Sequence, residues 1–501
     1  MSRKFITALL LFSMLVTSAP ALAASPVPGK SCPAIGKTQS TSTKKFTCVA
    51  KKAKKVWNSG VPIVKAYSPK GFSRDRCKKD LSAEGEAVKI QDFLGAKGGC
   101  VHAIKIVEAH LPSQRPKSNE SADSLFLDST LCKSENSASS ESWKGFPGQA
   151  KNSAFKTKRH PSPSTVMQVI PIYSSDAPKG STTPYQDYKY YFDFIKDYFS
   201  YIDDSGGRFE LRVPEAYVNF PNKIADYGIR HAKDDELSKN FIQDVISTVD
   251  KDINFNEINF SLVIVPAGTP SGVIGQQGFR GALSSEGQIT NLAVSQPATY
   301  TRFDNSVTSG SVSPMVWLHE FYHPGLNLGD NHANNSVNYD DERGMGDFGL
   351  MSNVNGDLLA WQKWILGFLT DQQIRCVSRD ATSTISWLAP SSLKSTRDKL
   401  LVIPLGGSKS IVVESIRAVG ISYKYPAESL GALVYVVDSS EVRQDYGYNV
   451  MYPDTRRPKS TEFAMADAPL KLGESVTIEG YKITNIEWGD FGDVLKVEHL
   501  N

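Results

Sequence analysis

The middle of the chain alternates between strand-like and helix-like patterns of hydrophobic residues. Short apolar runs of the kind that form buried strands occur at residues 166–173, 260–268 and, in a weaker form, 288–294. Apolar and aromatic residues recur at helical spacing over residues 181–202 and 234–253. Thr183 can cap the first of these helices, because Pro184 follows at a position that needs no backbone donor. The pattern predicts a mixed α/β layer, of the α+β kind, for residues 161–370.

Beyond residue 371 the pattern changes to short β-type runs separated by turn residues. Seven such runs follow one another, among them KLLVIPL, ALVYVVD and DVLKVEHL. Short strands at regular spacing are typical of a β-sandwich. Residues 371–501 are therefore predicted to form a β-rich, β-sandwich-like C-terminal domain.

The first residues have the pattern of a secretory signal peptide. Arg3 and Lys4 precede an apolar run over residues 5–16, and Ala21 and Ala23 offer a small-residue cleavage site. The apolar run is shorter than the ~20 residues that a membrane span needs. We therefore expect residues 1–23 to be removed from a secreted or extracellular protein that has no membrane span in its mature form.

Composition adds a charge asymmetry to this picture. The 501 residues are 40% apolar and 22% charged, an ordinary content that is enough for two or three domains, and the net charge is +3. No acidic residue precedes Asp75, whereas lysines crowd residues 24–60. This small basic module is a candidate binding surface for an anionic cell-envelope polymer, and a solvated lysine-rich segment is the alternative. We expect no nucleic-acid partner.

The cysteines indicate disulfides. All six lie beyond the predicted cleavage point, and an even number in an exported chain is typical of paired cysteines. Cys32 and Cys48 flank a turn-rich stretch inside the basic module and are the pair that the sequence favours. Residues 61–160 have a mixed pattern that ends in a linker rich in Ser, Lys and Pro, and they are a candidate pro-segment.

Candidate chemistry is concentrated in the stretch HEFYH, residues 319–323. His319 and His323 are four residues apart, so on a helix their imidazoles share one face and can bind one metal ion. Glu320 adjoins the first ligand, where a general base must stand to take a proton from metal-bound water. The pattern predicts a Zn2+ site and the hydrolysis of peptide bonds.

With its surroundings this stretch resembles the metzincins, a family of zinc metallopeptidases whose longer signature is H-E-x-x-H-x-x-G-x-x-H followed by a Met-turn. The segment GMGDFGLMSN, which contains Met351, is similar to the Met-turn, and residues 355–369 are similar to the helix that follows it in immune inhibitor A-like and gametolysin-like secreted peptidases. The resemblance covers roughly residues 166–369. It implies a metzincin-like catalytic domain, with Met351 as an apolar floor beneath the metal.

The third zinc ligand that the resemblance implies does not fall at the family's spacing. Counted from His319 it would be Gly329, which has no side-chain donor, and Pro324 is expected to end the zinc helix one turn early. An insertion of three residues around Pro324 restores the family's spacing between Gly329 and a final histidine, which favours His332 as the third ligand. Asp330 is the alternative, because the immune inhibitor A-like members resemble a version that ends in aspartate and carboxylates also bind zinc.

An acidic cluster follows the metal motif. Asp340, Asp341, Glu342 and Asp347 offer enough oxygens for a Ca2+ site, although a solvated acidic loop is commoner. A protein or peptide substrate is expected to lie extended along an exposed strand edge, for which residues 288–294 are the candidate. Together these features predict a secreted zinc-dependent endopeptidase. The competing interpretation is a non-catalytic cell-envelope binding or interaction protein with a degenerate metallopeptidase domain.

Overall fold

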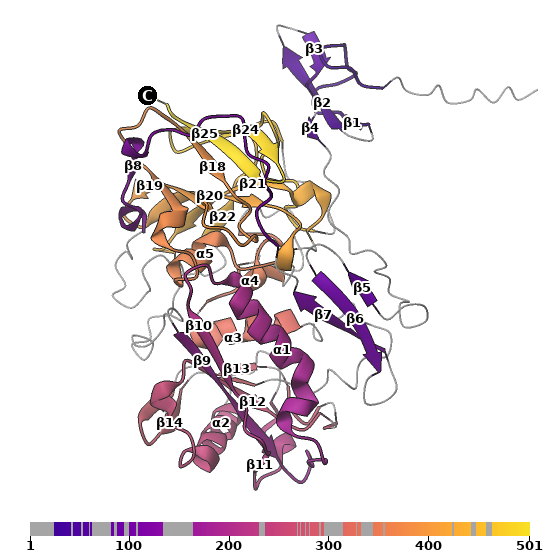
Figure 1. Cartoon of the computed structure of the whole chain (residues 1–501), viewed down its shortest axis with the longest axis vertical. Coiled ribbons are helices and arrows are strands. Elements are labelled where there is room, and N and C mark those ends of the chain that lie inside the picture. The colour runs from indigo at the N-terminus through magenta and orange to yellow at the C-terminus, as the bar shows by residue number, and fades with distance from the viewer. Residues whose placement is uncertain are drawn as a thin grey trace, which may run out of the picture. The chain divides into compact units, whose positions relative to one another are not determined.

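The computed structural model describes residues 25–62, 82–133, 164–331 and 344–500, apart from gaps inside these ranges (Figure 1). The chain forms two compact units, Met1–Ile63 and Val64–Asn501. The predicted signal peptide at residues 1–23 lies outside the described residues. In the part of the chain that is described, no helix is both long and apolar enough to cross a membrane.

The first unit contains a small antiparallel sheet closed by a disulfide. β2 (Lys44–Lys51) pairs with the other three strands, which are β1 (Thr38–Ser40), β3 (Lys54–Trp57) and β4 (Val61–Pro62). Cys32 and Cys48 form the disulfide predicted from the sequence. Together with Phe46 and Trp57 they make up the buried core. Because a core of four side chains is too small to stabilise a fold alone, this unit depends on its disulfide.

The α/β part of the second unit is built on a six-stranded sheet of order β10-β9-β12-β16-β13, in which β11 also pairs with β9. Its strands are β9 (Ser164–Tyr173), β10 (Arg208–Arg212), β11 (Val218–Asn219), β12 (Phe260–Ile264), β13 (Gln277–Phe279) and β16 (Leu292–Val294). In this sheet β13 alone is antiparallel to its neighbour. β16 lies between β12 and β13, so the prediction that residues 288–294 form the exposed edge of this sheet is wrong for residues 292–294: β13 pairs with them and takes the edge position. Residues 288 and 289 pair in a separate hairpin.

Helices cover both faces of this sheet, because its central strands carry apolar residues on both faces. The helices are α1 (Pro184–Ile202), α2 (Glu236–Val249) and α3 (Pro314–Leu326). Met167 of β9 belongs to the core that contains α1 and α3, whereas Ile170 of the same strand belongs to the core that contains α2. Thr183 caps α1 as predicted, since its hydroxyl oxygen accepts the N–H of Gln186 at 3.2 Å. The mixed α/β layer predicted from the sequence is therefore present.

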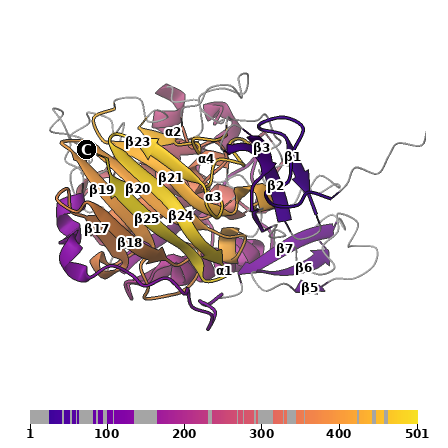
Figure 2. The same ribbon diagram turned by 90° about the horizontal axis from the view of Figure 1, so that it is seen from above.

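Two further sheets make up the C-terminal part, and they share one core (Figure 2). The six-stranded sheet, in spatial order, contains β22 (Tyr448–Val450), β21 (Gly431–Asp438), β20 (Lys409–Ile416), β19 (Leu400–Gly406), β17 (Ile374–Val377) and β8 (Phe126–Leu127). The four-stranded sheet contains β18 (Ser383–Leu388), β25 (Gly492–His499), β24 (Tyr481–Gly489) and β23 (Ser475–Ile478). Val413 of the first sheet and Leu495 of the second are both fully buried in this shared core.

The remaining elements are short. A separate antiparallel sheet consists of β5 (Ser82–Glu84), β6 (Val88–Leu94) and β7 (Cys100–Ile106), and β14 (Ala282–Ser284) forms a hairpin with β15 (Gly287–Ile289). Two short helices, α4 (Leu350–Asn353) and α5 (Ala360–Ile365), follow α3 along the chain. The 3-10 helices are η2 (Asp123–Leu125), η3 (Ser129–Cys132), η5 (Ile224–Tyr227), η6 (Phe255–Glu257), η9 (Asp371–Gln373), η10 (Gly420–Ser422) and η11 (Ala427–Ser429).

Residues 109–133 join the C-terminal sheets, although they precede the α/β part in the sequence. β8 pairs with β17, and a disulfide links Cys132 to Cys376 of β17. Arg375 also forms an ion pair with Asp123, at 2.7 Å between Nη1 and Oδ1. Strand pairing, an ion pair and a disulfide thus bind this part of the predicted N-terminal region to the C-terminal half.

The Cys132–Cys376 disulfide joins residues that are 244 positions apart, so its loss should greatly increase the freedom of the unfolded chain. We expect the C132A/C376A variant to lose about 2–5 kcal/mol of the free energy of unfolding. Denaturant unfolding followed by tryptophan fluorescence measures this loss. The matched control is C32A/C48A, whose disulfide lies in the first unit and spans 16 positions. Unchanged unfolding of the second unit in C132A/C376A would contradict the prediction.

Candidate metal centre

Helix α3 carries the two candidate histidines, and its apolar side fixes it in the core. Trp317, Leu318 and Phe321 are buried there. The indole of Trp317 stacks on the ring of Tyr191 from α1, with ring centroids 4.3 Å apart. Because these side chains hold one side of α3, the face with His319 and His323 has a fixed direction.

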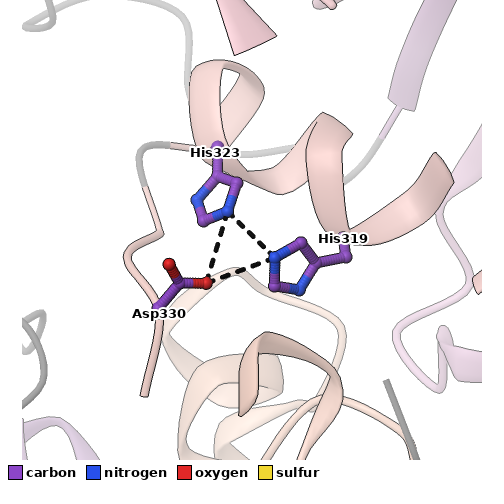
Figure 3. A group of neighbouring side chains, drawn as sticks. All are labelled: His319, His323 and Asp330. Carbon is purple, nitrogen blue, oxygen red and sulfur yellow. Dashed lines mark hydrogen bonds and ion pairs between the residues drawn. The ribbon is translucent and has the colours of Figure 1, made fainter. Parts of the chain in front are cut away.

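Three donor atoms from α3 and the segment after it meet at one point (Figure 3). The Nε2 atoms of His319 and His323 are 3.0 Å apart, and Oδ1 of Asp330 lies 3.2 Å from the first and 3.5 Å from the second. A tetrahedral zinc ion with bonds of about 2.0–2.1 Å places its ligand atoms about 3.3 Å from one another. The triangle formed by the three donors therefore fits the dimensions of a zinc site.

Two backbone carbonyls determine which imidazole nitrogens face the centre. Nδ1 of His319 lies 3.0 Å from the carbonyl oxygen of Leu350, and Nδ1 of His323 lies 2.8 Å from that of Leu328. A carbonyl oxygen only accepts hydrogen bonds, so each Nδ1 carries the proton and donates it. In a neutral imidazole this leaves the lone pair on Nε2, the tautomer that a metal ligand requires.

The local electrostatics favour a positive charge between the three side chains. Partial burial would raise the pKa of Asp330, but hydrogen bonds with His319 and His323 outweigh burial and hold this pKa well below its usual range. Burial would lower the pKa of His323, but the hydrogen bond to Asp330 and the charges of Asp330 and Glu320 raise it overall. An ionised carboxylate facing two imidazoles is a suitable donor set for a divalent cation.

The end of α3 differs from the prediction. The helix continues through Pro324 to Leu326, so the expectation that Pro324 ends it at once is wrong. Leu328 then donates its N–H to the carbonyl of Tyr322 at 3.0 Å, a bond of the type that closes helix C-termini. Pro324 removes one helical donor, but close to the end of a buried helix this loss is tolerated. Because the turn follows directly, Asp330 reaches the two histidines.

The structure brings together three of the residues selected from the sequence and places two others nearby. His319, His323 and Asp330 converge, whereas His332 lies outside the described residues. Glu320 is buried on α3, with an exposed fraction of 7%, and Met351 is completely buried in the core against which α3 packs. The role of Met351 as a floor beneath a metal stays a prediction.

The candidate calcium ligands fall mainly outside the described part of the chain. Asp340, Asp341 and Glu342 are not among the described residues, so a calcium site stays a prediction. Asp347 is described and buried, and its carboxylate accepts the N–H of Ala464 at 2.7 Å. This carboxylate therefore connects the Met351 segment to the C-terminal half.

Tyr425 contacts the segment that orients His319, and the sequence did not single it out. Its hydroxyl accepts the N–H of Gly349 at 3.0 Å, directly before Leu350, whose carbonyl orients His319. A side chain at Gly356 would collide with the same hydroxyl. Gly349 and Gly356 were the only hint in the sequence, because glycine is typical of positions that another group approaches closely. Nothing in the sequence indicated which group that would be.

The comparisons with known proteins add no relative to this geometry. No protein-family model matches the chain, and no curated protein matches it. The described residues form a mixed α/β protein with a His-His-Asp group that could hold a metal ion. The functional argument therefore depends on the site itself.

We expect His319→Ala, His323→Ala and Asp330→Ala each to weaken zinc binding by more than about 100-fold, since loss of a partner outside the ligand shell already weakens it 10–100-fold. His332→Ala is the matched comparison, and it should retain most of the affinity. Competition with a chromophoric chelator measures the affinity, and elemental analysis measures the zinc content. A greater loss in His332→Ala than in Asp330→Ala would show that the site ends in histidine.

Replacing Tyr425 by phenylalanine removes the acceptor for the Gly349 N–H without changing the ring. The Leu350 carbonyl should then hold His319 less firmly, and we expect zinc affinity to fall about tenfold. Tyr201→Phe is a matched control, because it also removes a buried tyrosine hydroxyl that bonds to the main chain, here by donating to the carbonyl of Ser392. Chelator competition on both variants tests the effect. Equal zinc affinities would contradict a role of Tyr425 in the metal site.

Proposed function

We propose that the chain is a secreted zinc-dependent endopeptidase of metzincin type, with His319, His323 and Asp330 as zinc ligands. The observation that carries the proposal is the triangle of donor atoms, whose sides of 3.0, 3.2 and 3.5 Å fit tetrahedral zinc. Three protein ligands leave a fourth coordination position open, as in catalytic zinc sites. A purely structural zinc site would usually have four protein ligands.

Glu320 is the proposed general base. It follows His319 on α3 and is buried, and its charge contributes to the raised pKa of His323, so its carboxylate acts on the ligand group. Zinc at this site would supply a Lewis acid that lowers the pKa of a coordinated water to about 7. A carboxylate beside the ligands can then hold a proton on its oxygen and transfer it to the leaving amine.

The edge strand β13 is the proposed place for a peptide substrate. β13 ends the sheet, and α3 packs against both β13 and β16. A strand at a sheet edge offers main-chain donors and acceptors to which an extended peptide can add. In this arrangement the substrate lies beside the helix that carries Glu320, which is what hydrolysis of a peptide bond requires.

The remaining parts of the proposal concern the C-terminal half and the location. Two sheets with one shared core support a β-sandwich-like C-terminal domain. The disulfides Cys32–Cys48 and Cys132–Cys376 support an extracellular location, where cysteines stay oxidised. The converging donors favour the peptidase over the competing interpretation, a non-catalytic protein with a degenerate site, because the three side chains together can hold a metal ion.

Glu320→Gln should leave zinc bound and remove most hydrolysis, because the carboxylate acts on the proton and is not a ligand. We expect kcat/KM on casein or gelatin to fall by about 10²–10⁴-fold. Glu215→Gln, which changes an exposed glutamate, is the matched control. Zinc content is measured in parallel. Unchanged activity of Glu320→Gln would disprove the mechanism, and zinc-loaded wild-type protein without hydrolytic activity would favour the binding protein.

A further inference from the structure

The first unit carries a concentrated positive charge that the metal site does not use. Residues 25–62 contain eight lysines and no Asp, Glu, Arg or His. The structure describes the side chains of six of these lysines, and all six are exposed: Lys30, Lys37, Lys44, Lys51, Lys54 and Lys55. Because the module has no carboxylate, its lysines have no internal partner of opposite charge.

The hairpin between β2 and β3 concentrates four of these lysines within residues 51–55. Lys51 and Lys54 are directly opposite each other in the antiparallel register. Directly opposed residues have Cβ atoms roughly 5 Å apart, and like charges at such positions destabilise a sheet. An anionic ligand bound at this exposed tip would reduce the repulsion between the lysines and so stabilise the hairpin.

The other lysines extend the charge along the module. Lys44 begins β2 and lies seven residues from Lys51, which corresponds to about 23 Å along a strand. Lys37 lies beside β2, because its carbonyl accepts the N–H of Cys48, and Lys30 lies beside β3, because its carbonyl accepts the N–H of Trp57. One small anion cannot contact groups this far apart, whereas a chain of repeated anionic groups can.

The side chains of the module favour one class of polyanion. Proteins that bind single-stranded nucleic acids use exposed aromatic rings on which bases stack. Here both aromatic residues, Phe46 and Trp57, are buried in the core, and the absence of arginine removes the bidentate donor that reads guanine. Lysine binds phosphate as a point charge without reading its surroundings. The composition thus fits a flexible phosphate-bearing polymer that has no stacked bases.

We propose that residues 25–62 are a binding module for a cell-envelope polymer with repeating phosphodiester groups, which retains the chain at the surface where that polymer is exposed. The β2–β3 hairpin tip makes the densest contact, and Lys30, Lys37 and Lys44 extend it along the polymer. This function is separate from the proposed peptidase activity, since no residue of the module belongs to the metal site.

The test measures binding of the full chain to immobilised poly(glycerol phosphate) at physiological salt. We expect K51Q/K54Q/K55Q to bind about tenfold more weakly or worse, with a smaller dependence on salt, because fewer counterions are released. K51R/K54R/K55R should retain binding. The matched control K223Q/K239Q/K251Q removes the same charge from exposed lysines of the second unit and should bind like the wild type. Detection of the Cys32–Cys48 disulfide by mass spectrometry confirms that each variant folds.

Other outcomes would overturn the proposal. Equal losses in the glutamine variant and its control would assign binding to overall charge, and equally tight binding of single-stranded DNA would assign the module to nucleic acids. Competition by millimolar inorganic phosphate would indicate a site for a small anion. Casein hydrolysis by K51Q/K54Q/K55Q is measured in parallel and should equal that of the wild type, so failure of this proposal is distinguishable from failure of the peptidase.

Discussion

The hydrogen bonds from two imidazoles to the carbonyls of Leu328 and Leu350 are the constraint on which the candidate site depends. They fix the tautomer and the ring plane of His319 and His323, so both Nε2 atoms point to the position that Asp330 also reaches. One carbonyl belongs to the turn after α3, and the other begins α4. The geometry of the three donors therefore requires the turn after α3 and the start of α4 to be placed correctly, as well as α3 itself.

The C-terminal half provides that placement through buried polar contacts. Lys363 of α5 forms an ion pair with Asp357, with 2.7 Å between Nζ and Oδ2, and both side chains are almost fully buried. The carbonyl of Asp357 accepts the N–H of Leu350. Glu414 of β20 accepts the N–H of Ala360 at the start of α5. Buried charges are tolerated only when their partners are present, so these contacts favour a single arrangement of the segment from Met351 to α5.

Much of the fold could be predicted because its signals are local. The apolar run of β9, the cap of α1 and the spacing of Cys32 and Cys48 each act over less than twenty residues. The helix with both histidines was predictable for the same reason. The pairing of β8 with β17, the edge position of β13 and the support from Tyr425 join distant segments, and no local pattern encodes such partners.

The position of Asp330 illustrates the same limit at the site. Sequence spacing between Gly329 and His332 favoured His332, with Pro324 expected to end the helix early and a loop expected to return to the metal. Core packing of Trp317 and Phe321 instead holds α3 helical to Leu326, and the tertiary contacts outweigh the local preference of proline. With the helix end at Leu326, Asp330 lies beside the two imidazoles, and His332 lies outside the described residues.

The link between Cys132 and Cys376 also has a consequence for how the molecule survives proteolysis. With the backbone between them it forms a covalent ring that contains the whole α/β layer and α3 with its two histidines. A single cut inside the ring opens it without releasing a fragment, because the disulfide still joins the two pieces. The pairing of β8 with β17 also holds them together. A cut between residues 62 and 82, in contrast, detaches the lysine-rich module from the rest of the chain. The covalent topology thus distinguishes cuts that leave the two pieces joined from cuts that release the lysine-rich module.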